Sequence, residues 1–139
     1  KNFSVLLGTN YQEVIEAAGG FKQDPEKVIS GGPMMGMAMF TLDVPVAKTS
    51  SAITCLTKDQ VAEMEPTACI RCGRCAEVCP QGLEPFAITG FVRRGEYQEA
   101  KKIHVLDCIE CGSCSYICPA RVPLTDYCKL AKYEIRKKK

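Results

Sequence analysis

The sequence predicts an α+β protein organised in two parts. Residues 1–54 hold short apolar runs of strand character around one short helical stretch, which is typical of a small mixed α/β region. Residues 55–139 hold two dense cysteine runs and, between and after them, segments of helical spacing rich in helix formers. We therefore expect a mixed region over 1–54, followed by a mostly helical, cysteine-bearing domain over 55–139.

The composition excludes several classes of protein. Of 139 residues, 46% are hydrophobic and 24% are charged, and the net charge is +2, so nothing favours nucleic acid as a partner. No stretch approaches the roughly 18 consecutive apolar residues of a membrane-spanning helix, so we expect no transmembrane segment of its own. The chain begins without a Met and without the features of a signal peptide, and we expect it to be a piece of a longer protein.

The first region is expected to combine strands with one helix. Its predicted strands are residues 3–7, 27–30, 44–48 and 52–56. A helix is predicted over 11–18, ended by Gly19-Gly20, because glycine adopts the positive φ of a helix stop. The run Gly31-Gly32-Pro33-Met34-Met35-Gly36 is expected to form a tight turn, with its methionines packed against a neighbour.

The second region is expected to be helical outside its cysteine runs. Helices are predicted over 85–92 and 96–104, separated by Gly95, and a closing helix is predicted over 124–139. The apolar stripe of this closing helix consists of Leu124, Tyr127, Cys128, Leu130, Ala131 and Ile135.

Two cysteine runs form an internal repeat. Cys69–Pro80 recurs as Cys108–Pro119 at an offset of 39 residues, and seven of the twelve positions are identical. Each run has the spacing C-x2-C-x2-C-x3-C-P, the pattern of bacterial ferredoxins with two iron–sulfur clusters. Three cysteines on a tightly curled loop can reach three iron corners of one cubane, and the fourth, before the proline, points to the neighbouring cluster.

The chain is therefore expected to hold two [4Fe–4S] clusters and to pass single electrons through them. The expected ligands of one cluster are Cys69, Cys72, Cys75 and Cys118, and those of the other are Cys108, Cys111, Cys114 and Cys79. Gly73 and Gly112 stand where the backbone must curl close to sulfide. The apolar residues expected to shield the clusters from water are Ile70, Val78, Ile109 and Ile117.

Other metal chemistry and other roles fit this pattern less well. Structural zinc uses paired C-x2-C motifs that are usually separated by a dozen or more residues, and a disulfide framework does not use such tight, regular spacing.

The remaining Cys55 and Cys128 are expected to be small buried hydrophobes, and His104 a surface or packing residue. Arg93-Arg94 and the C-terminal lysines are expected to be solvated charge, with an acidic redox partner or an anionic membrane surface as the alternative. No catalytic triad or carboxylate pair is visible, so we expect no substrate chemistry from this chain alone.

The ordered motifs resemble a known family. Gly31–Gly36, then Pro45-Val46-Ala47-Lys48-Thr49, then the two cysteine runs, resemble the C subunit of the Rnf-type ion-translocating electron transport complex. Residues 8–36 resemble the soluble-ligand-binding β-grasp module that precedes the ferredoxin domain in that family. The resemblance implies a partial β-grasp region over 1–54 and a dicluster 4Fe–4S ferredoxin-type domain with a C-terminal helix over 55–139. The helical insert between the runs resembles the α-helical ferredoxins.

The resemblance also implies a setting. The family's complex couples electron flow between reduced ferredoxin and NAD to sodium or proton movement, and its C subunit is peripheral, on the cytoplasmic face of the bacterial cytoplasmic membrane. The implied partners are the other subunits of the complex and ferredoxin-like or flavin electron donors and acceptors. FMN and NADH are expected only in a missing upstream domain, because nothing in this sequence matches the family's flavin and nicotinamide site.

Two rival functions remain open from the sequence. A cobalamin reductase of a bacterial microcompartment shares the β-grasp and dicluster layout, and would use the clusters without ion translocation. A structural metal-binding module would hold zinc or inert clusters for assembly.

Overall fold

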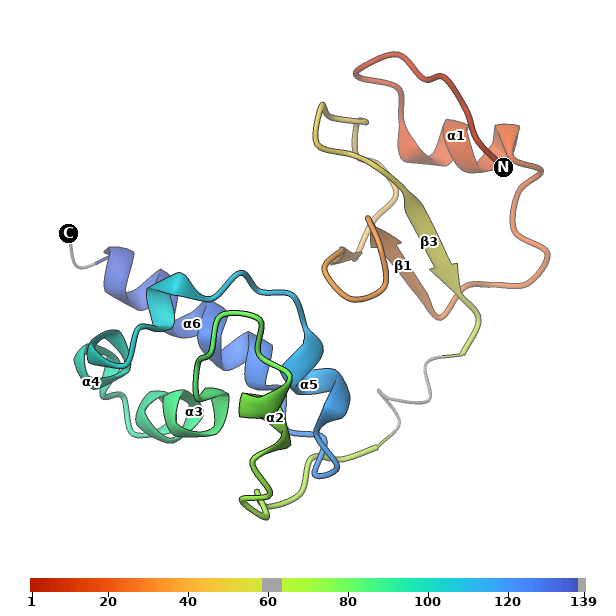
Figure 1. Cartoon of the computed structure of the whole chain (residues 1–139). Coiled ribbons are helices and arrows are strands. Elements are labelled where there is room, and N and C mark those ends of the chain that lie inside the picture. Colours follow the sequence, from red (N-terminus) through yellow and green to blue (C-terminus); the bar gives the residue numbers. More distant parts are fainter. Residues whose placement is uncertain (59–63, 138–139) are drawn as a thin grey trace. The chain divides into compact units, whose positions relative to one another are not determined.

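The computed structural model describes residues 1–58 and 64–137 of the chain. The chain divides into two compact units, Lys1–Gln60 and Val61–Lys139, and each is described here by itself. The first unit holds a small sheet and one helix, and the second is built from helices (Figure 1). The predicted α+β class is therefore confirmed. Residue 54, after which we place the domain boundary, lies within the last strand of the first unit.

Three antiparallel strands form the sheet of the first unit. Strand β1 (Lys27–Ser30) lies in the centre, with β2 (Met37–Met39) on one side and β3 (Ile53–Leu56) on the other. Ile29 of β1 lies opposite Ala38 and Thr54. The strands predicted over 27–30 and 52–56 are confirmed, whereas β2 was not expected.

Helix α1 (Tyr11–Ala17) begins and ends as its sequence predicts. The Asn10 side chain accepts a hydrogen bond from the Gln12 N–H, which satisfies one of the free donors at the start of the helix. At the other end Gly20, with φ of 69°, donates its N–H to the Ile15 carbonyl at 2.9 Å.

Two predicted strands of the first unit are wrong. Residues 3–7 and 44–48 are described, and neither forms a strand. Residues shortly after the first segment form backbone hydrogen bonds with the second. Gly8 N–H donates to the Val46 carbonyl at 2.9 Å, and Val46 N–H donates to the Thr9 carbonyl at 2.8 Å. Next to these bonds lies Pro45, which has no N–H to extend a ladder, and only an isolated bridge joins it to Asn10.

The Gly31–Gly36 run forms the predicted turn, between β1 and β2. Gly36 donates its N–H to the Gly32 carbonyl at 2.8 Å. The expected packing of the methionines is wrong, because Met34 and Met35 are 49% and 62% exposed. The turn is held by backbone contacts, so its methionine side chains are free to point outward.

Gly36→Ala is expected to destabilise the first unit by about 1–3 kcal/mol, the usual range for overpacking. An added Cβ would lie 2.4 Å from Ile29 Cγ2 and 2.5 Å from the Gly32 carbonyl oxygen, and the latter is backbone that cannot rotate away. Faster amide hydrogen exchange along β1 would measure the loss. Gly32→Ala is the control, because no heavy atom lies within 4 Å of its added Cβ. Equal exchange in the two variants would contradict the prediction.

The second unit consists of five α-helices and a 3-10 turn among its described residues. They are α2 (Arg74–Glu77), α3 (Pro85–Arg93), α4 (Tyr97–Lys102), η1 (Val105–Asp107), α5 (Ser113–Ile117) and α6 (Leu124–Lys137). The helices predicted over 85–92 and 124–139 are confirmed, although residues 138 and 139 lie outside the described part. The helix predicted over 96–104 is shorter, and the 3-10 turn follows it.

The core of the second unit lies where α6 packs against α3 and α4. Ile88, Ala100 and Ala131, one residue from each helix, are fully buried there. Cysteines of both runs, Cys79 and Cys108, pack against the edge of this core. The core therefore supports the cysteine runs directly.

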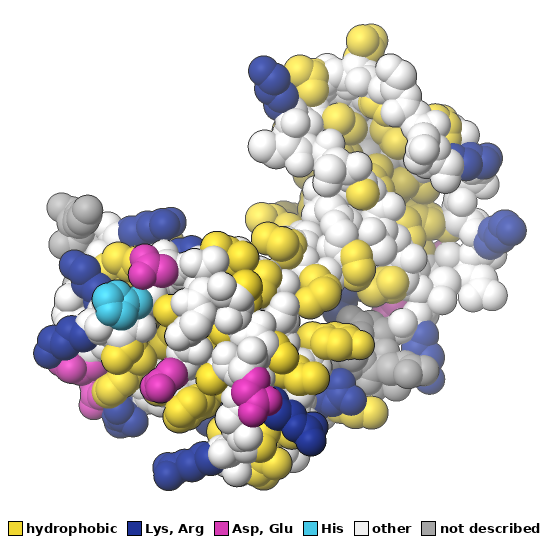
Figure 2. Space-filling view, viewed as in Figure 1, with side chains coloured by type: hydrophobic (Ala, Val, Ile, Leu, Met, Phe, Trp, Pro, Cys, Tyr) yellow, Lys and Arg dark blue, Asp and Glu magenta, His cyan; other side chains and the backbone are white. Residues whose placement is uncertain are grey.

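The surface of the second unit mixes charges of both signs. Basic and acidic side chains are interspersed over its visible face (Figure 2). Arg93 lies over the Tyr127 ring at 5.2 Å, and Arg94 pairs with Glu96 at 2.8 Å. These two arginines therefore have partners within the unit. No helix in the described ranges, 1–58 and 64–137, has both the length and the apolar character needed to cross a membrane.

Candidate metal centre

The two cysteine runs follow the same backbone path. The residue two positions after the first cysteine has a positive φ in each run, 55° at Arg71 and 59° at Glu110. Its N–H donates to the sulfur of that first cysteine, Cys69 or Cys108, at 3.4 Å in both runs. Residues other than glycine adopt this conformation only when their surroundings impose it. The repeat in sequence is therefore also a repeat in conformation.

A glycine completes each loop. Gly73 has φ of 80° and Gly112 has φ of 83°, a conformation that glycine reaches without steric penalty. Each glycine directly precedes a short helix, α2 or α5, that carries the third cysteine of its run. These cysteines, Cys75 and Cys114, are both 8% exposed, so they lie on the inner side of the loops.

The eight cysteines of the runs line two separate cavities of the second unit. The first cavity is lined by Cys69, Cys72, Cys75 and Cys118, and the second by Cys79, Cys108, Cys111 and Cys114 together with Cys128. The last cysteine of each run thus lies at the cavity of the other run. This grouping has the same membership as the ligand sets that we predict from the spacing.

The four thiols of each set fit an iron–sulfur cubane in their chemistry. Among the described residues, no three Cys, His, Asp or Glu side chains converge closely enough to hold one metal ion. A cubane does not require such convergence, because each of its four iron corners takes a thiolate of its own. A donor set composed only of thiols arranged round a cavity is the one that such a cluster needs.

Several groups stabilise the sulfur atoms. Leu83 donates its N–H to Cys79 Sγ at 3.4 Å, and the hydroxyl of Thr125 lies 3.5 Å from Cys114 Sγ. Hydrogen bonds to sulfur favour the thiolate, which is the form that binds iron. With the two N–H groups at the loop starts included, three of these contacts reach cysteines of the second cavity, and one, from Arg71 to Cys69, reaches the first.

The surroundings of Cys108 favour its thiolate form. A hydrogen bond from the Cys128 thiol, assisted by the Glu110 N–H and the charge of Lys132, lowers the pKa of Cys108 to about 6. The same hydrogen bond, together with burial, raises the pKa of Cys128, so Cys128 remains a thiol. Burial raises the pKa of Cys75 and Cys114.

The environment of the residues outside the ligand sets is partly as predicted. Cys128 is 1% exposed and is the small buried residue that we expect, and His104 lies at the surface. The prediction for Cys55 is wrong, because its side chain is exposed on the sheet. Of the apolar residues expected to shield the cavities, Ile70 and Ile109 border them and are 68% and 50% exposed, whereas Val78 and Ile117 line neither cavity.

No role at a cavity is predicted from the sequence for two residues of α6. Cys128 lines the second cavity, and Lys132 donates a hydrogen bond to the carbonyl of Cys108, which also lines it, at 2.9 Å. Their spacing of four residues, on one face of a predicted helix, is the sequence signal that could have placed them together.

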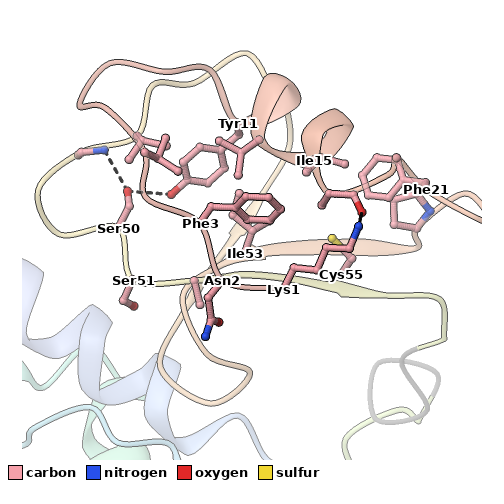
Figure 3. A pocket seen from close by; sticks show the side chains of 18 of the residues that line it. Lys1, Asn2, Phe3, Tyr11, Ile15, Phe21, Ser50, Ser51, Ile53 and Cys55 are labelled. Carbon is pink, nitrogen blue, oxygen red and sulfur yellow. Dashed lines mark hydrogen bonds between the residues drawn. The ribbon is translucent and has the colours of Figure 1, made fainter.

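A separate hollow of about 1080 Å³ lies in the first unit (Figure 3). Phe3, Ile15 and Ile53 give it apolar walls. The Tyr11 hydroxyl lies 2.7 Å from Ser30 Oγ and donates to Ser50 Oγ at 2.9 Å, so this polar group is satisfied within the unit. These lining residues supply shape and apolar surface.

Comparison with known proteins gives one family match in each of the two units. A family model described as a 4Fe-4S dicluster domain matches residues 62–119, and a model described as an SLBB domain matches residues 1–38.

Curated relatives match almost the whole chain. The C subunit of the proton-translocating ferredoxin:NAD(+) oxidoreductase complex of Clostridium ljungdahlii is 49% identical over 98% of this chain and 30% of its own length. Its Na(+)-translocating counterpart of Acetobacterium woodii is 45% identical over 97% of this chain and 30% of its own length. The C subunit of the ion-translocating oxidoreductase complex of Rhodobacter capsulatus is 45% identical over 94% of this chain and 25% of its own length. The chain thus spans less than a third of these relatives, and over nearly its whole length it is homologous to the C subunits of the Rnf-type ion-translocating oxidoreductase complexes.

Proposed function

We propose that this chain relays single electrons through two [4Fe–4S] clusters bound in the two cavities. The proposed ligands are the first three cysteines of each run together with the last cysteine of the other run. The observation that carries the proposal is the grouping of the eight cysteines, four at each cavity, across the two runs. The match to a 4Fe-4S dicluster domain supports iron–sulfur over zinc as the bound group.

When bound, such a cluster supplies a centre that takes up one electron and gives it back. The chain's own residues would then hold the two centres at a fixed separation and stabilise the charge on the ligand sulfurs. The N–H groups of Arg71, Leu83 and Glu110 are placed for the second task, since each donates to a cysteine sulfur. The helical core that packs against Cys79 and Cys108 would hold the two centres at their fixed separation.

We also propose the setting of the relay. The names of the relatives support a place in an ion-translocating ferredoxin:NAD oxidoreductase complex. Within such a complex, the proposed place of the chain is a peripheral, membrane-associated subunit at the cytoplasmic face. Ferredoxin-like or flavin groups of the complex would give and take the electrons. FMN and NADH would bind in a part of the subunit outside this chain. The same names favour this setting over cobalamin reduction.

Anaerobic reconstitution of the chain with iron and sulfide tests the relay. We expect about eight irons per chain and, after reduction with dithionite, the electron paramagnetic resonance spectrum of two interacting reduced cubanes. About four irons per chain would refute the two-cluster assignment. A metal-loaded chain that is silent to reduction would favour the structural metal-binding module.

A further inference from the structure

A buried lysine of α6 lies against the second cysteine run. Lys132 is only 9% exposed, although lysine is among the residues least often buried unless it is paired. Its Nζ donates to the Cys108 carbonyl at 2.9 Å and forms an ion pair with the Glu110 carboxylate. A charged group is kept in such a place only when its partners replace the lost water.

Glu110 connects this lysine to a ligand sulfur. The N–H of Glu110 donates to Cys108 Sγ at 3.4 Å, while its side chain holds the ammonium group of Lys132. Glu110 also has the positive φ that closes the loop. One cation and one anion of the chain are thus fixed beside the first ligand of the second run.

The first run has a different arrangement at the same position. Arg71 has the same φ region and makes the same N–H bond to sulfur as Glu110, but its side chain is exposed. The first two cysteines of the first run are also more exposed to solvent than those of the second. Cys69 and Cys72 are exposed, whereas Cys108 and Cys111 are partly buried. Charges near the first cavity are therefore screened by water and salt more than those near the second.

We propose that Lys132 and Glu110 set the reduction potential of the second centre, with opposite signs. This inference rests on the proposed function, since it requires a cluster in each cavity. Reduction adds one electron, and hence one negative charge, to the centre. A fixed cation beside it stabilises the reduced form and a fixed anion destabilises it. Lys132 therefore raises the potential of the second centre, and Glu110 moderates that effect.

The test is a redox titration of the reconstituted 139-residue chain, followed by electron paramagnetic resonance. Lys132→Met is expected to lower the potential of one centre, and Glu110→Gln to raise the potential of that same centre. Each change is expected to alter the reduction equilibrium constant on the order of tenfold, which is about 59 mV for a one-electron couple. The potential of the other centre is expected to stay at its original value.

Lys129→Met is the matched control, because Lys129 belongs to the same helix but is exposed. Its removal is expected to leave both potentials unchanged. If Lys132→Met fails to load iron, Glu110→Gln tests the inference by itself, because the inference requires that this variant raise the potential of one centre. Unchanged potentials in Glu110→Gln, or shifts of both centres alike, would overturn the inference. These outcomes are distinct from a failure of the proposed function, which the iron count and spectrum of the unaltered chain would reveal first.

Discussion

Cys79→Ala is expected to release the centre held by the second cysteine run and to leave the centre of the first run loaded. Cys79 belongs to the first run in sequence, but it lines the cavity of Cys108, Cys111 and Cys114. Loss of one of four thiolates leaves an iron corner without its protein ligand. The iron content should fall from about eight to about four per chain.

Anaerobic alkylation followed by mass spectrometry would show which cysteines lose protection. In Cys79→Ala, the expected labels fall on Cys108, Cys111 and Cys114, all of them in the other run. Cys118→Ala should give the reciprocal result, with labels on the first three cysteines of the first run. Labelling follows thiol accessibility, so it reports ligation separately for each cysteine.

Cys55→Ala controls for the loss of a cysteine as such. Cys55 is exposed on the sheet of the first unit and lies outside both cavities, so the iron content should stay at its original value. Labelling of Cys69, Cys72 and Cys75 in Cys79→Ala would mean that each run binds its own cluster. That result would refute the crossed ligand sets.

The cysteine loops could be predicted because their information is local. Cysteines spaced three residues apart, a glycine such as Gly73 and a following proline are local signals of a tightly curled loop. The end of the helix over Tyr11–Ala17 is predictable for the same reason, since Gly19-Gly20 follow it. For this helix the prediction is confirmed.

The strand predictions that are wrong concern segments whose structure is determined by contacts between residues far apart in the sequence. Residues 3–7 have the apolar character of a strand, but a strand needs a partner, and Pro45 limits the pairing of this part to a few bonds. Conversely, β2 contains two methionines and follows a glycine-rich turn, so its composition is a poor strand signal. It forms because β1 lies beside it.

The environment of the second cavity is also a tertiary property. Lys132 lies 22 residues after Glu110 in the sequence, and only the packing of α6 brings the two together. A lysine in the middle of an amphipathic helix is ordinarily assigned to the solvent side. The pattern alone therefore predicts the ligands but not the charges placed beside them.

Ile88→Ala is expected to produce the largest loss of stability in the second unit. Ile88 is fully buried in α3, in the cluster that includes Val105 and Cys128 and that packs against Cys79 and Cys108. Truncation of a buried isoleucine to alanine costs about 2–5 kcal/mol, because apolar contact is lost and a cavity remains. For a unit of this size, even the lower figure lowers the melting temperature by roughly 8–16 °C.

Leu130→Ala on α6 is the matched control, because Leu130 is 42% exposed and alanine favours a helix. Thermal unfolding of the reconstituted chain, followed by circular dichroism and by the loss of iron–sulfur absorbance, would compare the two variants. We expect both signals to move together in Ile88→Ala, since the core that it weakens also holds the edge of the second cavity. A lower melting temperature with unchanged loss of absorbance would mean that the cavities are held independently of this core. Melting temperatures that fall equally in the two variants would contradict the assigned role of Ile88.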